Sequence, residues 1–293
     1  MLDEDTLSLV LTELNLADLH RLGCVCRHLF KAVVDEQGRR SFIGSPYVVL
    51  KLQHPTSLAL LADGVLAVGG KTYGEHVVRI QNGLSEATVA HTVRAVAVSE
   101  GMRLYVLDEH HVLMGCLPEH GLPQWYDAAS PLELDFEEAT SLALIGERLL
   151  VMDTGEARVV ALDAASLQLQ MVISSLWWPM GAAAVENQLY ITEMGADRVA
   201  VTSLAGVRQR TLQLDAVYGL VAPQGIAAIA ACSEHEALLV VACERCALVM
   251  STRGIVMQRV LLGRRRLGCV VCDDSHVYVT EYERGRVWRL VIW

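Results

Sequence analysis

Residues 189–198, LYITEMGADR, contain the unit on which the body of this chain is built. A short apolar run ends on an acidic residue, Glu193, a turn of four residues follows, and Arg198 opens the next run. The same kind of run recurs as LAVGG ending at Gly70, LYVLD at Asp108, LLVMD at Asp153, LVVAC at Cys243 and VYVTE at Glu281. The successive ends are 38, 45, 40, 50 and 38 residues apart, which averages about 42.

Three copies place an arginine five residues after the acid, in the pairs Asp153/Arg158, Glu193/Arg198 and Glu281/Arg286. Two residues that flank a short turn face each other across a hairpin, where opposite charges contribute about 0.2–1 kcal/mol. A structural ion pair repeated in several units is therefore expected, in preference to a binding site.

A period near 42 residues with several short strands in each copy is typical of a β-propeller, in which each copy is a four-stranded blade. Six copies fit the chain. In one copy the strands are expected at Gly181–Val185, Leu189–Glu193, Arg198–Thr202 and Val207–Leu214. The last copy has three strands before the chain ends, and Tyr47–Leu52 precedes the first copy without a blade of its own. Pairing of Tyr47–Leu52 with Val287–Ile292 would close the ring and remove two open sheet edges.

Residues 1–40 follow a different period. Leu7, Val10, Leu11 and Leu14 recur at helical spacing, and Asn15–Asp18 has the form of a capping box that starts a second helix. Two or three short helices are expected here. The chain therefore divides into a small helical domain, 1–40, and a propeller, 41–293.

Composition narrows the possible functions. The chain has 293 residues, 53% of them hydrophobic and 20% charged, with a net charge of −10. This excludes disorder as the main state, and no apolar run reaches the roughly 18 residues of a membrane span. The acidic balance argues against nucleic acid as a partner, with Arg264–Arg266 as the one basic cluster. The acidic N-terminus lacks the pattern of a secretory signal, so we expect reduced cysteines and a cytoplasmic or nuclear location.

Cysteine spacing raises the possibility of a metal site. Cys243/Cys246 and Cys269/Cys272 both have CxxC spacing, with 22 residues between the pairs, close to that of a zinc ribbon. Cys269 and Cys272 fall on a predicted strand, however, where residues three apart point to opposite faces. Packed core thiols are therefore expected, with no metal and no cofactor.

Catalytic residues are not evident. His110 and His111 fall in a turn of the second copy, where solvated side chains are the usual outcome, and acids and histidines are otherwise scattered. No catalytic residue is assigned, and a non-catalytic role is expected.

Two stretches resemble known families. Residues 2–36, LDEDTLSLVLTELNLADLHRLGCVCRHLFKAVVDE, resemble the F-box, although Asp3 replaces its usual proline and Phe30 lies near the place of its tryptophan. The body resembles an NHL-type six-bladed propeller in its Pro-x-Gly openings at Pro179 and Pro223, its YVTE-like strands and its Arg-Val pairs.

The resemblance implies a substrate-receptor subunit of a cullin–RING ubiquitin ligase. The F-box would dock a Skp-type adaptor, and through it a cullin scaffold, while the propeller would bind a protein target, with the loop at Cys232–Ala237 as one candidate surface. The expected adaptor-binding residues form the apolar face of the helical domain: Leu2, Leu7, Leu11, Leu14, Leu16, Leu19, Leu22, Val25, Cys26 and Leu29. Two alternatives stay open: a six-bladed propeller enzyme of the lactonase or lyase kind, and an NHL-like RNA-binding scaffold.

Overall fold

The structure of the protein is a computed structural model. It describes residues 47–51, 53–60, 66–72, 75–80, 85–88, 92–99, 103–108, 111–116, 124–126, 136, 138–214, 222–231, 236–262, 266–273 and 276–291. The expected helical domain, 1–40, and its ten apolar residues lie outside the described residues.

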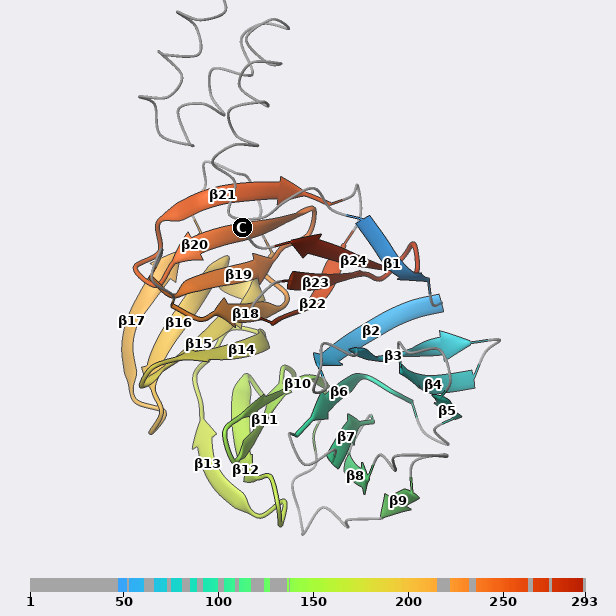
Figure 1. Cartoon of the computed structure of the whole chain (residues 1–293). Coiled ribbons are helices and arrows are strands. Elements are labelled where there is room, and N and C mark those ends of the chain that lie inside the picture. The colour runs from blue at the N-terminus through green and yellow to red at the C-terminus, as the bar shows by residue number, and fades with distance from the viewer. Residues whose placement is uncertain are drawn as a thin grey trace, which may run out of the picture.

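The described strands form six antiparallel sheets of four strands each, arranged in a ring (Figure 1). In chain order, the first three sheets contain β2 (Gln53–Leu60), β3 (Leu66–Thr72), β4 (Glu75–Ile80), β5 (Ser85–Thr88); β6 (Ala95–Val98), β7 (Arg103–Leu107), β8 (Val112–Cys116), β9 (Gln124–Tyr126); and β10 (Ala139–Ile145), β11 (Arg148–Asp153), β12 (Arg158–Asp163), β13 (Leu169–Ile173). The other three contain β14 (Pro179–Val185), β15 (Gln188–Glu193), β16 (Arg198–Ser203), β17 (Arg208–Gln213); β18 (Ile226–Ile229), β19 (Leu238–Ala242), β20 (Cys246–Ser251), β21 (Val256–Leu261); and β22 (Leu267–Cys272), β23 (His276–Glu281), β24 (Arg286–Val291), β1 (Tyr47–Lys51). The mainly β propeller in the expected fold class is confirmed.

The ring joins the two ends of the described chain. β1 pairs antiparallel with β24, with Tyr47 opposite Arg289 and Lys51 opposite Arg286. The strand near residue 47 therefore completes the sheet that the last three strands begin. The first strand of every sheet contacts the first strands of its two neighbours, in the order β2, β6, β10, β14, β18, β22 and back to β2. These six strands surround the axis of the propeller.

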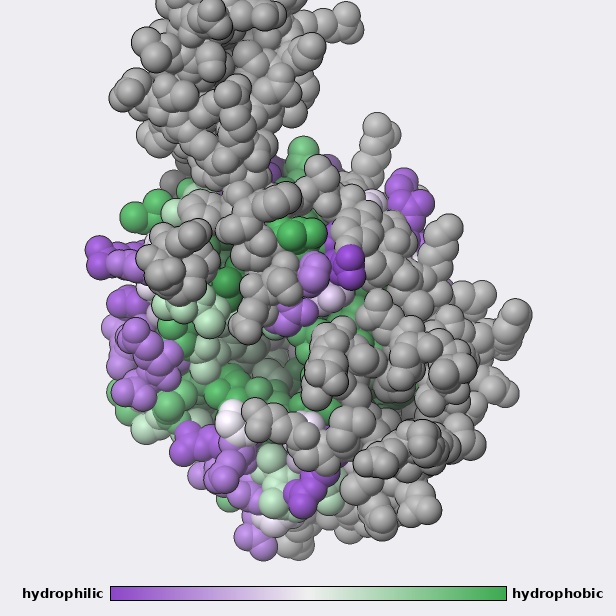
Figure 2. Space-filling view, in the orientation of Figure 1, coloured by the Kyte–Doolittle hydropathy of each residue, from purple (hydrophilic) through white to green (hydrophobic). Residues whose placement is uncertain are grey.

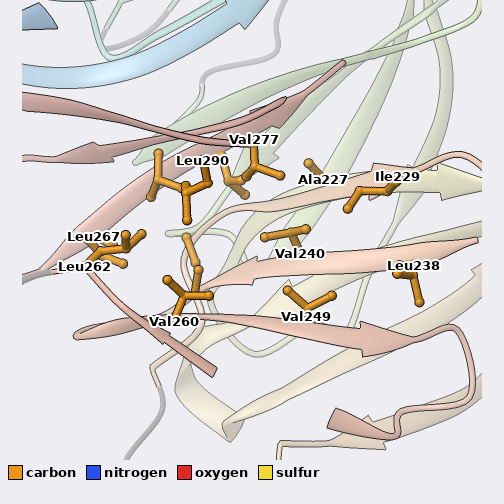
Figure 3. Packing of buried hydrophobic residues seen from close by; sticks show 14 residues of the cluster. Ala227, Ile229, Leu238, Val240, Val249, Val260, Leu262, Leu267, Val277 and Leu290 are labelled. Atoms are coloured by element: carbon orange, nitrogen blue, oxygen red, sulfur yellow. The ribbon is translucent and has the colours of Figure 1, made fainter. Parts of the chain in front are cut away.

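Burial follows each strand's place within its blade. All five residues of β19 are buried, because this strand lies inside its sheet and both of its faces pack against neighbouring blades. Figure 3 shows one such contact, in which Val240 and Val249 of one blade pack near Val277 and Leu290 of the next. The outer strands β13 and β17 are mostly exposed, which matches their mixed polar sequences.

Side-chain hydroxyls connect the inner parts of neighbouring blades. The Thr154 hydroxyl donates to the carbonyl of Pro179 at 2.7 Å, and the Thr192 hydroxyl donates to the carbonyl of Gln224 at 2.7 Å. Each acceptor belongs to the start of the next blade. A buried hydrogen bond of this kind contributes about 1 kcal/mol and also sets the relative height of the two blades.

Among the described residues, no helix has the length and apolar character that crossing a bilayer requires. The single described helix is a 3₁₀ turn, Met194–Ala196.

Candidate functional site: the central channel

The six inner strands enclose a cavity of about 350 Å³ on the propeller axis. Hydrophobic residues surround the hollow at the centre of the ring in Figure 2. Small and aliphatic side chains dominate the lining, which comprises residues 58–60, 96–98, 141–145, 181–184, 225–228 and 269–272. None of these residues carries a formal charge.

Glycines bring neighbouring inner strands together where these strands begin. The Gly225 amide donates to the carbonyl of Gly268 at 3.1 Å, so β18 and β22 touch through their backbones. A Cβ atom added at Gly225 would lie 2.7 Å from that carbonyl, and one added at Gly181 would lie 3.0 Å from the carbonyl of Gln224. Only glycine allows this close backbone approach, which narrows the channel where β14 and β18 begin.

Three side chains supply the polar atoms of the lining: Ser141, Cys269 and Cys272. The Cys269 thiol points to the carbonyl of Leu58 at 3.7 Å, and the Cys272 thiol donates to the carbonyl of Ala228 at 2.7 Å. Burial raises the pKa of the Cys269 thiol, so it is neutral at physiological pH. The channel is therefore suited to a neutral molecule with a large apolar part.

The acidic residues at the ends of the second strands have a structural role within their blades. The Glu193 carboxylate is fully buried and accepts hydrogen bonds from Arg198 Nε at 2.6 Å, Arg208 Nη2 at 2.7 Å and the backbone amide of Trp177 at 2.9 Å. The Glu193 carboxylate therefore connects β15, β16 and β17 to the segment that precedes β14.

The other two expected acid–arginine pairs have different outcomes. Asp153, also fully buried, accepts from Arg158 Nε at 2.7 Å, as the spacing predicts. Glu281 instead accepts from the indole of Trp288 at 3.1 Å and lies 3.6 Å from Arg284 Nε. The guanidinium of Arg286 lies over the Trp288 ring at 5.8 Å. The spacing predicted the facing backbone positions in all three blades, but the neighbouring tryptophan changes the side-chain partner in the last one.

Donors for a metal ion are scattered in the described part of the chain. No group of three or more His, Cys, Asp or Glu side chains there could hold one. The lining offers one hydroxyl and two thiols from separate positions. This set of donors in the described lining does not fit a metal centre.

The channel was missed by the sequence reasoning, which concentrated on the leucine-rich N-terminus. A signal was present: the strands that open the copies, TSLALI at 140–145, GAAAV at 181–185 and GIAAI at 225–229, are rich in small residues. Small residues at this point are expected where six strands converge on one axis.

The prediction that all four of these cysteines pack in the core is correct for Cys243 and Cys246, which are buried. Cys269 and Cys272 are instead partly exposed to the channel.

Comparison with known proteins supports the fold and gives no family. No family model and no curated protein matches the chain. Among solved structures, a gluconolactonase from Xanthomonas campestris has a TM-score of 0.64 at 11% identity, covering 85% of this chain and 89% of its own. A streptogramin B lyase has a TM-score of 0.58 at 9% identity, with coverage of 85% and 98%. A catalytically inactive virginiamycin B lyase from Staphylococcus aureus, solved with quinupristin, has a TM-score of 0.58 at 11% identity, with coverage of 85% and 99%.

These findings correct the expected identity. The assignment to an F-box protein with an NHL-type propeller is wrong, because no family model matches and the similar solved structures are named as lactonase and lyase enzymes. The expected role as a non-catalytic ubiquitin-ligase receptor is withdrawn with it, as are the Skp-type adaptor and the cullin scaffold as partners. The physical reason is that a leucine pattern at helical spacing occurs in many amphipathic helices and does not specify a partner.

Proposed function

We propose that this propeller is an enzyme of the lactonase-like or lyase-like kind, which binds a small neutral organic substrate in its central channel. The observation that carries the proposal is the uncharged cavity of about 350 Å³, enclosed by all six inner strands. Its volume falls within the roughly 300–1,000 Å³ of small-molecule sites. The enzyme names of the structures with a similar fold support the reaction class.

The lining favours a substrate with an apolar body and few polar atoms. A buried charge without a partner would cost several kcal/mol, and the lining residues supply no countercharge. Ser141 provides the hydroxyl of the lining, which would donate a hydrogen bond to a carbonyl oxygen of the substrate. Cyclic esters and cyclic peptides with lipophilic side chains meet these requirements.

The test is a substrate panel with matched channel variants. Neutral lactones of increasing chain length, glucono-δ-lactone and quinupristin would be incubated with the purified protein, with products identified by mass spectrometry and binding measured by calorimetry. Ala184 lines the channel and is partly exposed there, so Ala184→Leu would fill part of the cavity. Ala165 is exposed in a turn outside the channel lining, and Ala165→Leu adds the same three carbons as a control.

We expect turnover of at least one apolar lactone or cyclic peptide, reduced at least tenfold in Ala184→Leu and unchanged in Ala165→Leu. Ser141→Ala should weaken binding of the same compound by about fivefold, because one hydrogen bond contributes about 1 kcal/mol. No binding and no turnover across the panel, or equal activity in both alanine variants, would refute the proposal.

A further inference from the structure

A pair of thiols lies at the hairpin turn between β19 and β20, separate from the strands that line the channel. Cys243 follows the last residue of β19, and Cys246 is the first residue of β20. The Cys243 amide donates to the carbonyl of Cys246 at 2.8 Å, which closes a turn formed by Glu244 and Arg245. In two other blades the corresponding turn carries the ion pairs of Asp153 and Glu193 with their arginines.

The backbone geometry permits a disulfide at this turn. Ala242 is opposite Ala247 in the ladder, so Cys243 and Cys246 are the next facing pair. Facing residues in an antiparallel pair have Cα atoms about 4.5–5.5 Å apart. A disulfide requires about 4.4–6.8 Å between Cα atoms, so the bond needs little backbone movement. The Cys243 thiol points to the carbonyl of Val241 at 3.6 Å, and the pKa of each thiol depends on the other.

An arginine from the outer strand distinguishes the two thiols. Arg259 of β21 is opposite Leu248, and Leu248 lies on the same side of its strand as Cys246. The hydrogen bond from Cys243 and the nearby Arg259 guanidinium lower the pKa of the Cys246 thiol to about 7, while the pKa of the Cys243 thiol is raised. Cys246 is therefore the thiol that ionises near neutral pH, and Cys243 stays protonated beside it.

We propose that Cys243 and Cys246 form a reversible oxidation site, which hydrogen peroxide converts from a dithiol to a disulfide. The Cys246 sulfur attacks one peroxide oxygen, an S–O bond forms, the O–O bond breaks, and the departing hydroxide takes up a proton to become water. The Cys243 sulfur then attacks the Cys246 sulfenic acid, an S–S bond forms, the S–O bond breaks, and the hydroxyl leaves with the Cys243 proton as a second water. Two thiols lose two protons and two electrons, and one peroxide becomes two waters.

The exposure of the site favours a small oxidant. Cys246 is 4% exposed and Cys243 is 1% exposed, while the adjoining Arg245 is exposed at the surface. Hydrogen peroxide is close to water in size, whereas a folded thiol–disulfide exchange partner would need a larger opening.

The second CxxC pair is a built-in control. Cys269 and Cys272 have the same spacing, but they lie within β22 and their thiols point to the carbonyls of Leu58 and Ala228, in two different neighbouring blades. This pair should not form an internal disulfide.

Peptide mapping of the whole chain tests the proposal. The protein would be treated with hydrogen peroxide at pH 7, alkylated and digested with trypsin, which cuts after Arg210, Arg245 and Arg253. Because Arg245 lies between the two cysteines, the disulfide holds peptides 211–245 and 246–253 together until dithiothreitol releases them. Peptide 211–245 also contains Cys232, so the measurement is repeated in Cys232→Ser, where the linked pair should persist.

Two further readouts are expected. Arg259→Gln should slow formation of the linked pair at pH 7 by about fivefold, because a rise of about one unit in the pKa of Cys246, from about 7, lowers its thiolate fraction from about one half to about one eleventh. Peptide 267–284, which carries Cys269 and Cys272, should be recovered with both thiols alkylated. Separate peptides 211–245 and 246–253 after oxidation of Cys232→Ser, or equal internal linkage of peptide 267–284, would overturn the proposal.

Discussion

Gly225→Ala should destabilise the propeller by about 2–3 kcal/mol, because a methyl group has no room between two inner strands. The added Cβ would lie 2.7 Å from the carbonyl oxygen of Gly268, 2.8 Å from the amide nitrogen of Val270 and 3.1 Å from Cα of Cys269. All three atoms belong to the backbone of β22, so no side chain can rotate away. The two blades must separate instead.

The magnitude follows from three contributions. Overpacking in a core costs about 1–3 kcal/mol. Separation of the strands also weakens the hydrogen bond from Gly225 to Gly268, which is worth about 1 kcal/mol. Replacing glycine by alanine returns about 0.4–1 kcal/mol through the lower entropy of the unfolded chain.

Urea unfolding monitored by tryptophan fluorescence would measure the change, with Gly195→Ala as the matched control. A Cβ at Gly195 would lie 3.4 Å from the Trp178 ring, an ordinary contact, so this variant should change the free energy of unfolding by less than about 0.5 kcal/mol. Equal midpoints for Gly225→Ala and the wild type, at the same slope, would refute the argument that backbone contact between blades requires this glycine.

Three other changes test individual interactions. Glu193→Gln should lower the free energy of unfolding by about 2–3 kcal/mol, because two arginines lose their buried carboxylate; a urea midpoint unchanged from wild type would contradict this. Thr192→Val should cost about 1 kcal/mol by removing the hydroxyl that bridges two blades, whereas Thr202→Val should be neutral or stabilising, since the Thr202 hydroxyl is buried without a hydrogen-bond partner; equal losses in the two variants would argue against the bridge. The alkylation rate of Cys246 should rise with pH through a midpoint of about 7, because the thiolate is the reactive form and the pKa of this thiol is lowered. Cys269, whose pKa is raised, should require a more alkaline pH than an ordinary thiol. Mass spectrometry of the labelled peptides would show the reverse order if these assignments are wrong.

The propeller fold could be predicted from the sequence because the same pattern of strands and turns recurs along the chain. The strands expected from Gly181 to Leu214 coincide with β14 to β17 within a few residues, because short strands separated by turns recur in the same order in the other copies. The acid–arginine spacing likewise predicted facing backbone positions. It did not predict that Glu281 would take Trp288 as its partner, because that choice depends on which side chain reaches the carboxylate in space.

The function was harder to predict from the sequence than the fold. The leucine pattern of residues 1–40 suggested a docking protein, and the comparisons overturned that identity. The channel left only a diffuse signal, since its lining combines short pieces of six strands that are about 40 residues apart in the chain. No single segment contains enough of the site to be recognised as one.

By itself, the sequence determined that this chain repeats a short-stranded unit. It also determined that the strand near Tyr47 lies outside the repeated copies and must pair with a strand elsewhere in the chain. These properties are local, because they depend on the alternation of apolar and polar residues and on turn residues between them. Tertiary structure alone decided that the glycines at 181, 225 and 268 meet around one axis, that the channel they help to narrow carries no charge, and that Arg259 lies beside Cys246. Each of these depends on distances between residues remote in the chain, and those distances exist only once the six sheets have closed into a ring.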